Sequence, residues 1–172
     1  MNAPFAKPEQ QPAHEFASMN GQADKWRGEC IQHFAELEQI VESLLQSLRN
    51  VPKYGRKVTI GQPVGTAFKH LRELACDKGP FASKGKVISI TLSELAPWFE
   101  WRAHLTHGVL SVWRGRNGQW LLALAHRPSN DGVIRTYALG WDEARKLREL
   151  LALQVVALGE NARSLTNSVQ KP

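Results

Sequence analysis

The residues best suited to chemistry lie in one short segment, residues 98–108, which ends in an arginine, two histidines and a glycine. An imidazole, with an ordinary pKa of about 6.5, exchanges a proton with a ribose 2′-hydroxyl near neutral pH. A guanidinium holds the charged oxygens of a phosphodiester transition state through paired hydrogen bonds. Arg102 and His107, with His104 between them, are therefore candidates for RNA cleavage without a metal ion.

The spacing of this segment decides how its side chains lie. In an unbroken helix, five residues at about 100° each place His107 about 140° round from Arg102, so that the two side chains diverge. If the helix loosens before Gly108, His107 turns back and shares a pocket with Arg102. The sequence leaves both arrangements open.

The run from Arg102 to Gly108 closes the third of four expected helices, and it resembles the R-x4-6-H motif of HEPN-domain proteins. The resemblance covers residues 24–107 and 142–161. It implies an up-and-down helical bundle that tolerates extra elements before its last helix. It also implies metal-independent RNA cleavage by a homodimer, which brings two motifs into one cleft, with Arg102 and His107 as the catalytic pair.

One position departs from the family's pattern. Active members usually carry a polar residue after the arginine, whereas this chain has Ala103, and His104 is the candidate to stand in for it. The alternative is therefore a HEPN-type fold without nuclease activity, which binds a protein or a nucleic acid.

A purely structural interpretation of the motif is also open. A histidine at a helix C-terminus often interacts with the last carbonyls and the helix dipole, and Arg102 could pair with Glu94 or Glu100. His104 and His107 are spaced to face one zinc ion, but no carboxylate or cysteine stands at a ligand spacing nearby. The sequence thus predicts no metal site and no other cofactor.

Charge points to a polyanionic partner. Residues 51–90 hold eight basic and two acidic side chains, a surplus as large as the net charge of +6 of the whole chain. Such a local surplus favours RNA, although a solvated basic loop is the simpler interpretation. The candidate phosphate contacts are Lys53, Arg56 and Lys57 in one loop, and Arg114 and Arg116 at a hairpin tip.

Length and composition exclude several classes of protein. A chain of 172 residues fits one domain with tails. Its longest apolar run, residues 121–125, is far shorter than a membrane span, and its first 22 residues lack the apolar core of a secretory signal. Two cysteines, Cys30 and Cys76, are expected to be reduced thiols of a cytoplasmic protein with no membrane association.

The expected elements form a mainly α fold, a four-helix up-and-down bundle with a three-stranded antiparallel β-meander inserted between helices 3 and 4. Apolar periodicity predicts helices, and alternation around turn residues predicts strands. Residues 80–90 are expected to be polar and then briefly extended, before a capping box at 91–94 opens the third helix. The helices are expected at 24–49, 64–77, 91–107 and 142–161, and the strands at 109–114, 119–126 and 133–139.

Three segments follow from this pattern. Residues 1–22 are expected to be a disordered arm, residues 23–161 a single domain with the meander at 108–140, and residues 162–172 a flexible tail.

The function predicted for the domain is a metal-independent endoribonuclease, serving as a toxin or defence component. Its expected partners are RNA, a second copy of the chain and a cognate protein.

Overall fold

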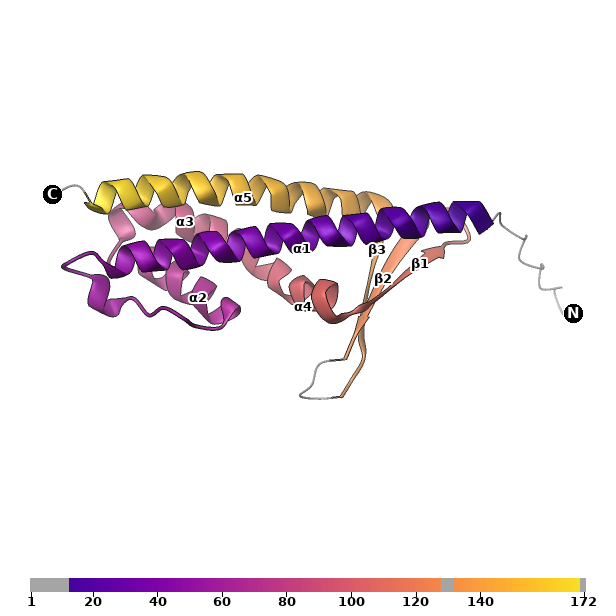
Figure 1. Cartoon of the computed structure of the whole chain (residues 1–172), viewed down its shortest axis with the longest axis horizontal. Coiled ribbons are helices and arrows are strands. Elements are labelled where there is room, and N and C mark those ends of the chain that lie inside the picture. The colour runs from indigo at the N-terminus through magenta and orange to yellow at the C-terminus, as the bar shows by residue number, and fades with distance from the viewer. Residues whose placement is uncertain (1–12, 128–131, 171–172) are drawn as a thin grey trace, which may run out of the picture.

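The computed structural model describes residues 13–127 and 132–170 of the chain. This part is mainly helical and carries a three-stranded antiparallel meander before its last helix, which confirms the predicted fold class (Figure 1). Its helices are α1 (Ala13–Arg49), α2 (Val64–Ala75), α3 (Ala82–Leu95), α4 (Phe99–His107) and α5 (Trp141–Gln170), with the 3-10 turns η1 (Gly55–Lys57) and η2 (Ala96–Trp98). Its strands are β1 (Val109–Arg114), β2 (Trp120–His126) and β3 (Arg135–Gly140).

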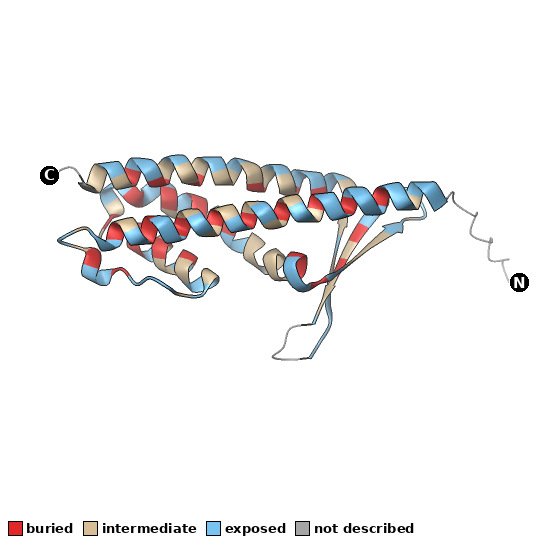
Figure 2. Ribbon diagram, in the orientation of Figure 1, coloured by how far each residue is buried: buried red, intermediate tan, exposed pale blue. Residues whose placement is uncertain are grey.

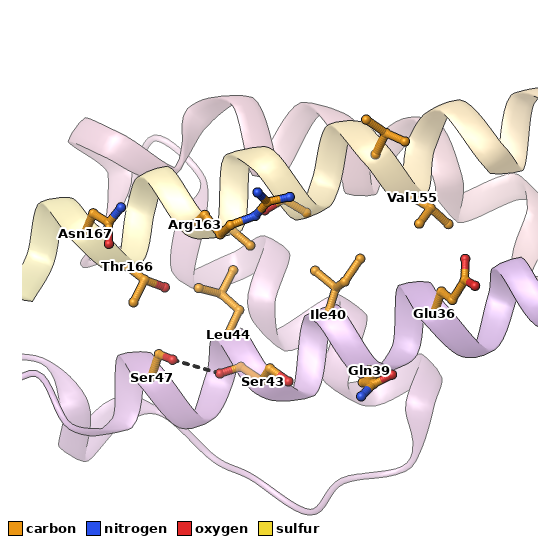
Figure 3. A pocket seen from close by; sticks show the side chains of 13 residues that line it. Glu36, Gln39, Ile40, Ser43, Leu44, Ser47, Val155, Arg163, Thr166 and Asn167 are labelled. Carbon is orange, nitrogen blue, oxygen red and sulfur yellow. Dashed lines mark hydrogen bonds between the residues drawn. The ribbon is translucent and has the colours of Figure 1, made fainter.

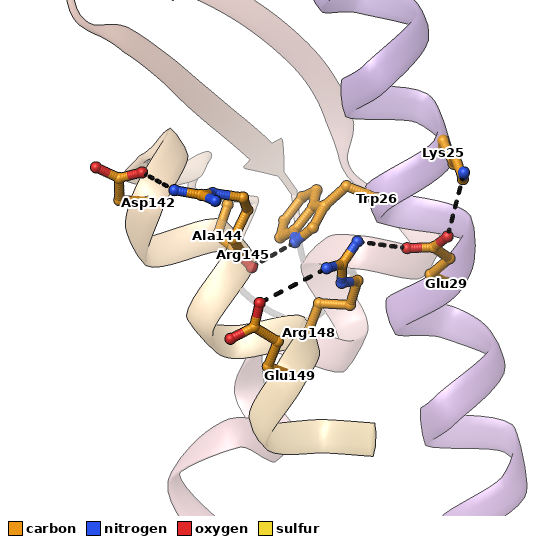
Figure 4. Close-up of polar contacts among 8 residues, drawn as sticks. All are labelled: Lys25, Trp26, Glu29, Asp142, Ala144, Arg145, Arg148 and Glu149. Atoms are coloured by element: carbon orange, nitrogen blue, oxygen red, sulfur yellow. Dashed lines mark hydrogen bonds and ion pairs between the residues drawn. The ribbon is translucent and has the colours of Figure 1, made fainter. Parts of the chain in front are cut away.

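The two long helices, α1 and α5, lie side by side and run parallel (Figure 1). The buried stripe of α1, which includes Trp26, Phe34 and Leu37, forms much of the core. Trp26 also donates its indole N–H to the carbonyl of Ala144 at 2.7 Å, and Arg148 pairs with Glu29 at 3.1 Å (Figure 4). These contacts fix the start of α5 against α1.

The shorter helices complete the bundle on one side of α1. The chain after α1 returns along the bundle through residues 50–63, so that α2 runs parallel to α1 and only α3 and α4 run the other way (Figure 1). The strict up-and-down order therefore does not hold for α2, because this connection is long enough to carry the chain back. Figure 2 shows that the buried residues gather where the helices face one another.

The described residues contain five α-helices instead of the expected four. The prediction of a polar and extended segment at 80–90 is wrong, because α3 already begins at Ala82. Gly85 lets this helix pack closely on α2, since a Cβ there would lie 2.8 Å from the Cβ of Ala75. Pro97 then interrupts the helix, because proline cannot donate the next hydrogen bond, and α4 starts after the turn η2.

Both ends of the domain extend further than expected. The disordered arm is wrong for residues 13–22, because α1 begins at Ala13, with Met19 buried and Phe16 packed edge-on against Trp120 at 4.9 Å. The flexible tail is wrong for residues 162–170, because α5 continues with Leu165 buried. The rest of both predictions, residues 1–12 and 171–172, lies outside the described residues.

The meander follows directly from α4. In its register Val109 pairs with Ala125 and Arg114 with Trp120, so that residues 115–119 make the turn. Gly115 donates its N–H to the carbonyl of Gln119 at 2.8 Å, and Gly118 adopts a φ of +79°. The turn thus has three residues, 116–118, between its closing pair, whereas an Asn-Gly pair is more typical of two-residue turns.

Candidate active site

The motif segment is an intact helix up to its last histidine. The N–H of Gly108 donates to the carbonyl of His104 at 2.9 Å, which continues the helical hydrogen bonding of α4. A Cβ at Gly108 would lie 2.3 Å from that same carbonyl oxygen, so only glycine fits where the chain turns from α4 into β1. Because the helix does not loosen, Arg102 and His107 diverge by about 140°.

Arg102 binds α1. Its Nε and Nη2 both donate to the carboxylate of Glu38, the second at 3.1 Å. The two side chains are 34% and 21% exposed, so the pair lies half-buried at the junction of α4 with α1. Among the contacts of the described residues, none joins Arg102 to His107.

Of the two partners that the sequence suggested for Arg102, Glu94 instead accepts a hydrogen bond from Gln154 on α5 at 3.2 Å. The other, Glu100, has a side chain that lies outside the described residues. A partner on α1 could not be found from local spacing, because Glu38 lies far from Arg102 in the chain. The arginine of the motif therefore joins two helices of the bundle.

His104 points into the protein and is only 4% exposed. Its ring packs edge-on against that of Tyr137 on β3, with 4.4 Å between centroids, and against that of His126 on β2 at 5.3 Å. Trp101 covers the same tyrosine at 4.9 Å. His104 thus anchors α4 on the sheet and is closed to a substrate.

His107 lies on the opposite rim of this cluster and is exposed. Its ring lies 5.9 Å from that of His126, with a tilt of 33° between the planes. No motif in the sequence marks His126. The hairpin register predicts its position, since pairing Val109 with Ala125 places residue 126 opposite residue 108, the residue that follows His107.

The C-terminal end of α4 is positively charged. Arg27 on α1 donates its Nε to the carbonyl of Leu105 at 2.6 Å and its Nη2 to the carbonyl of Thr106 at 3.4 Å. A cation at this position stabilises the last carbonyls and the negative end of the helix dipole. Arg135 is the cross-strand partner of His126, so its side chain leaves the same face of the sheet.

The predicted phosphate contacts are divided between the two ends of the molecule. Lys53, Arg56 and Lys57 are exposed around η1, beyond the C-terminus of α1 (Figure 1). Arg114 and Arg116 belong to the turn of the β1–β2 hairpin, which lies near the other end of α1. A helix of 37 residues is about 55 Å long, so the two groups cannot contact the same short stretch of RNA.

The two arginines of the β1–β2 hairpin differ in their contacts. Arg114 pairs with Glu15 at 2.9 Å, donates to the carbonyl of Gly118 at 3.1 Å and stacks over Trp120 at 5.4 Å. Arg114 therefore holds the hairpin on the start of α1. Arg116 is exposed at the turn and is the better placed of the two for a phosphate.

A groove of about 690 Å³ runs between α1 and α5 (Figure 3). Glu36 lies at one end of it on α1, and Arg163 lies on α5, closer to its middle (Figure 3). Its floor is formed by Ile40, Leu44, Val155 and Gly159. The groove is mainly apolar and carries no cluster of catalytic groups, so its shape suits a helix rather than a small substrate.

The two cysteines are free thiols, as predicted. Burial raises the pKa of Cys30 from 9.0 to about 12, against a smaller lowering by the nearby Arg148. Cys76 is half-buried and donates to the carbonyl of Glu73 at 3.2 Å. A neutral, buried Cys30 is not a nucleophile.

Among residues 13–127 and 132–170, no group of three or more His, Cys, Asp or Glu side chains is arranged to hold a metal ion. None of the helices in that part of the chain combines the length and the apolar character that crossing a bilayer requires.

Comparison with protein-family models, with curated proteins and with solved structures finds no match to this chain. Its function therefore has to be argued from the site.

Proposed function

We propose that this protein is a metal-independent endoribonuclease of the HEPN type, with His107 as a catalytic residue. The observation that carries the proposal is the position of His107, whose imidazole is exposed at the end of α4 and lies beside a second imidazole. The preceding residue, Thr106, accepts a hydrogen bond from Arg27 through its carbonyl. An accessible imidazole in a positively charged environment is suited to proton transfer at a phosphodiester.

The intact geometry of α4 changes the role proposed for the arginine. Arg102 uses two of its five N–H donors on Glu38 and fixes α4 against α1, so it acts within one protomer by positioning the helix. His104 supports the site from beneath, because it is buried against the sheet. Neither role needs a polar residue at Ala103.

A cytoplasmic nuclease of this kind would serve as a toxin or defence component, with a cognate protein to restrain it.

The experiment uses the purified full chain with single-stranded and structured RNA in the presence of EDTA. We expect cleavage by the wild type, a loss of at least about a hundredfold in His107→Ala, and unchanged cleavage in His14→Ala. His14 is an exposed histidine near the start of α1 and provides a matched control. Absence of cleavage by the wild type, or equal cleavage by His107→Ala, contradicts the proposal.

A second candidate function, a non-catalytic binding module, is favoured by the groove between α1 and α5. We propose a second copy of the chain as its occupant. A twofold axis that lies in the plane of the groove, parallel to the two helices, would place α1 of each copy over α5 of the other. The apolar floors of the two grooves would then face one another.

The size of this face suits a dimer. The two helices lie together along α5, which has 30 residues and is about 45 Å long. Such a helix pair offers a face on the order of the 800 Å² that each partner contributes to a stable interface. Leu153 and Val156, which are 68% and 59% exposed on α5, would lose contact with water there.

Light scattering on the full chain tests the dimer. Val156→Glu should give a monomer, because it would bury a charge without a partner in the apolar face, whereas Lys146→Glu, at an exposed position of α5 outside the groove, should leave the dimer intact. A monomeric wild type, or a dimeric Val156→Glu, contradicts this interface.

A further inference from the structure

His126 is the histidine whose position the sequence did not reveal. It ends β2, it is half-buried, and its ring faces two other imidazoles, His107 at 5.9 Å and His104 at 5.3 Å between centroids. The three histidines differ in access, because His104 is buried, His126 is partly open and His107 is exposed. Only His107 and His126 are therefore open to a substrate.

The distance between these two rings suits a group placed between them. RNA is cleaved when a 2′-hydroxyl attacks the adjacent phosphorus. This reaction needs a base at the 2′-hydroxyl and an acid at the 5′-oxygen of the leaving nucleotide. Two accessible imidazoles on neighbouring elements supply both, provided that one is neutral and the other protonated.

Charged and titratable groups from three elements surround the pair. Arg27 on α1 binds the carbonyls of Leu105 and Thr106 at the end of α4. Arg135 on β3 is the cross-strand partner of His126, and the rings of His104 and Tyr137 pack beneath the site. The guanidinium groups are suited to attract a phosphate.

We propose that His126 is the second catalytic residue of the site and that it works as an acid–base pair with His107; this rests on the ribonuclease function proposed above. The neutral imidazole takes the proton of the 2′-hydroxyl while the 2′-oxygen forms its bond to phosphorus. The bond from phosphorus to the 5′-oxygen breaks, and the imidazolium gives that oxygen its proton. The products are a 2′,3′-cyclic phosphate and a free 5′-hydroxyl, without metal or oxidant.

Cleavage kinetics across pH test the pair. The wild type should show a bell-shaped dependence, and His107→Ala and His126→Ala should each lose one limb and at least about a hundredfold in rate. Added imidazole should restore part of the activity of His126→Ala, because it replaces the missing group. A histidine that only supports the fold would not be rescued in this way.

The wild type and the two variants together separate the two proposals. An inactive wild type overturns both the function and the role of His126. Full activity and an unchanged pH profile in His126→Ala, with His107→Ala inactive, overturn the role of His126 alone.

Discussion

The guanidinium of Arg102 holds the carboxylate of Glu38 through two of its nitrogens, so the arginine of the motif connects α4 to α1 and does not meet His107. This contact separates the two parts of the motif. Arg102 holds the helix in place, and His107 is left at its open end, where the sheet brings His126 to it.

The first prediction concerns this ion pair. Arg102→Ala should lower the free energy of unfolding by about 1–2 kcal/mol, because it leaves a partly buried carboxylate without its partner. The pair is half-exposed, which keeps the effect below that of a buried one. Urea unfolding measures it, and the double variant Arg102→Ala with Glu38→Ala should cost less than the sum of the two single changes. Strict additivity would show that the pair contributes nothing.

The second prediction concerns Gly108. Gly108→Ala should destabilise the protein by about 1–3 kcal/mol and lower RNA cleavage, because the new Cβ would collide with the carbonyl of His104 and displace His107. Gly28→Ala is the matched control, since no atom lies within 4 Å of its added Cβ and alanine favours the helix. Gly108→Ala should unfold at a lower temperature and cleave RNA more slowly than Gly28→Ala. Equal unfolding temperatures and equal cleavage rates would contradict the role given to Gly108.

The long helices illustrate what the sequence could predict. The apolar stripe of α1 is regular enough to show a helix, and its buried members form the core as expected. Its first turns could not be predicted, because they depend on contacts with distant residues, such as Phe16 against Trp120. The end of α5 is similar, since Lys84 on α3 donates to the carbonyl of Ser168 at 2.9 Å.

The geometry of the candidate site also depends on contacts and pairings that the sequence does not determine. Arg102, His104 and His107 stand together in the sequence, but their directions depend on whether α4 stays regular, which Gly108 alone does not determine. His126 depends on the hairpin register. A two-residue turn at Asn117-Gly118 would shift that register by one position and turn every side chain of β2 to the other face. The sheet therefore had to be seen before His126 could be assigned.

The third prediction concerns the cysteines. At pH 8 a thiol reagent should label Cys76 and leave Cys30 unlabelled until the protein unfolds, because burial raises the pKa of Cys30 to about 12. The folded pKa lies above the ordinary value of 9.0, so this stabilising contribution is complete below pH 9 and is lost as the pH rises towards 12. Unfolding measured across that range should depend less steeply on pH in Cys30→Ala. Rapid labelling of both cysteines in the native protein would contradict the burial of Cys30.

The fourth prediction concerns the basic loop around η1. Reversing the charges of Lys53, Arg56 and Lys57 to glutamate should weaken RNA binding and make it less dependent on salt, since each lost phosphate contact removes about 0.7 from the slope. Reversal of Lys25 and Lys146, two exposed lysines elsewhere, is the control. Filter binding at several salt concentrations measures both. An equal loss in the control would mean that net charge alone governs binding.

We propose that two imidazoles, those of His107 and His126, cleave RNA without a metal ion. The decisive experiment compares an RNA with the same RNA carrying one 2′-deoxynucleotide at the cleaved position, in EDTA, with the product ends identified by mass spectrometry. We expect a 2′,3′-cyclic phosphate from the first RNA and no cleavage at the substituted position of the second. Cleavage of the deoxy position, or cleavage that requires a divalent metal ion, would contradict it.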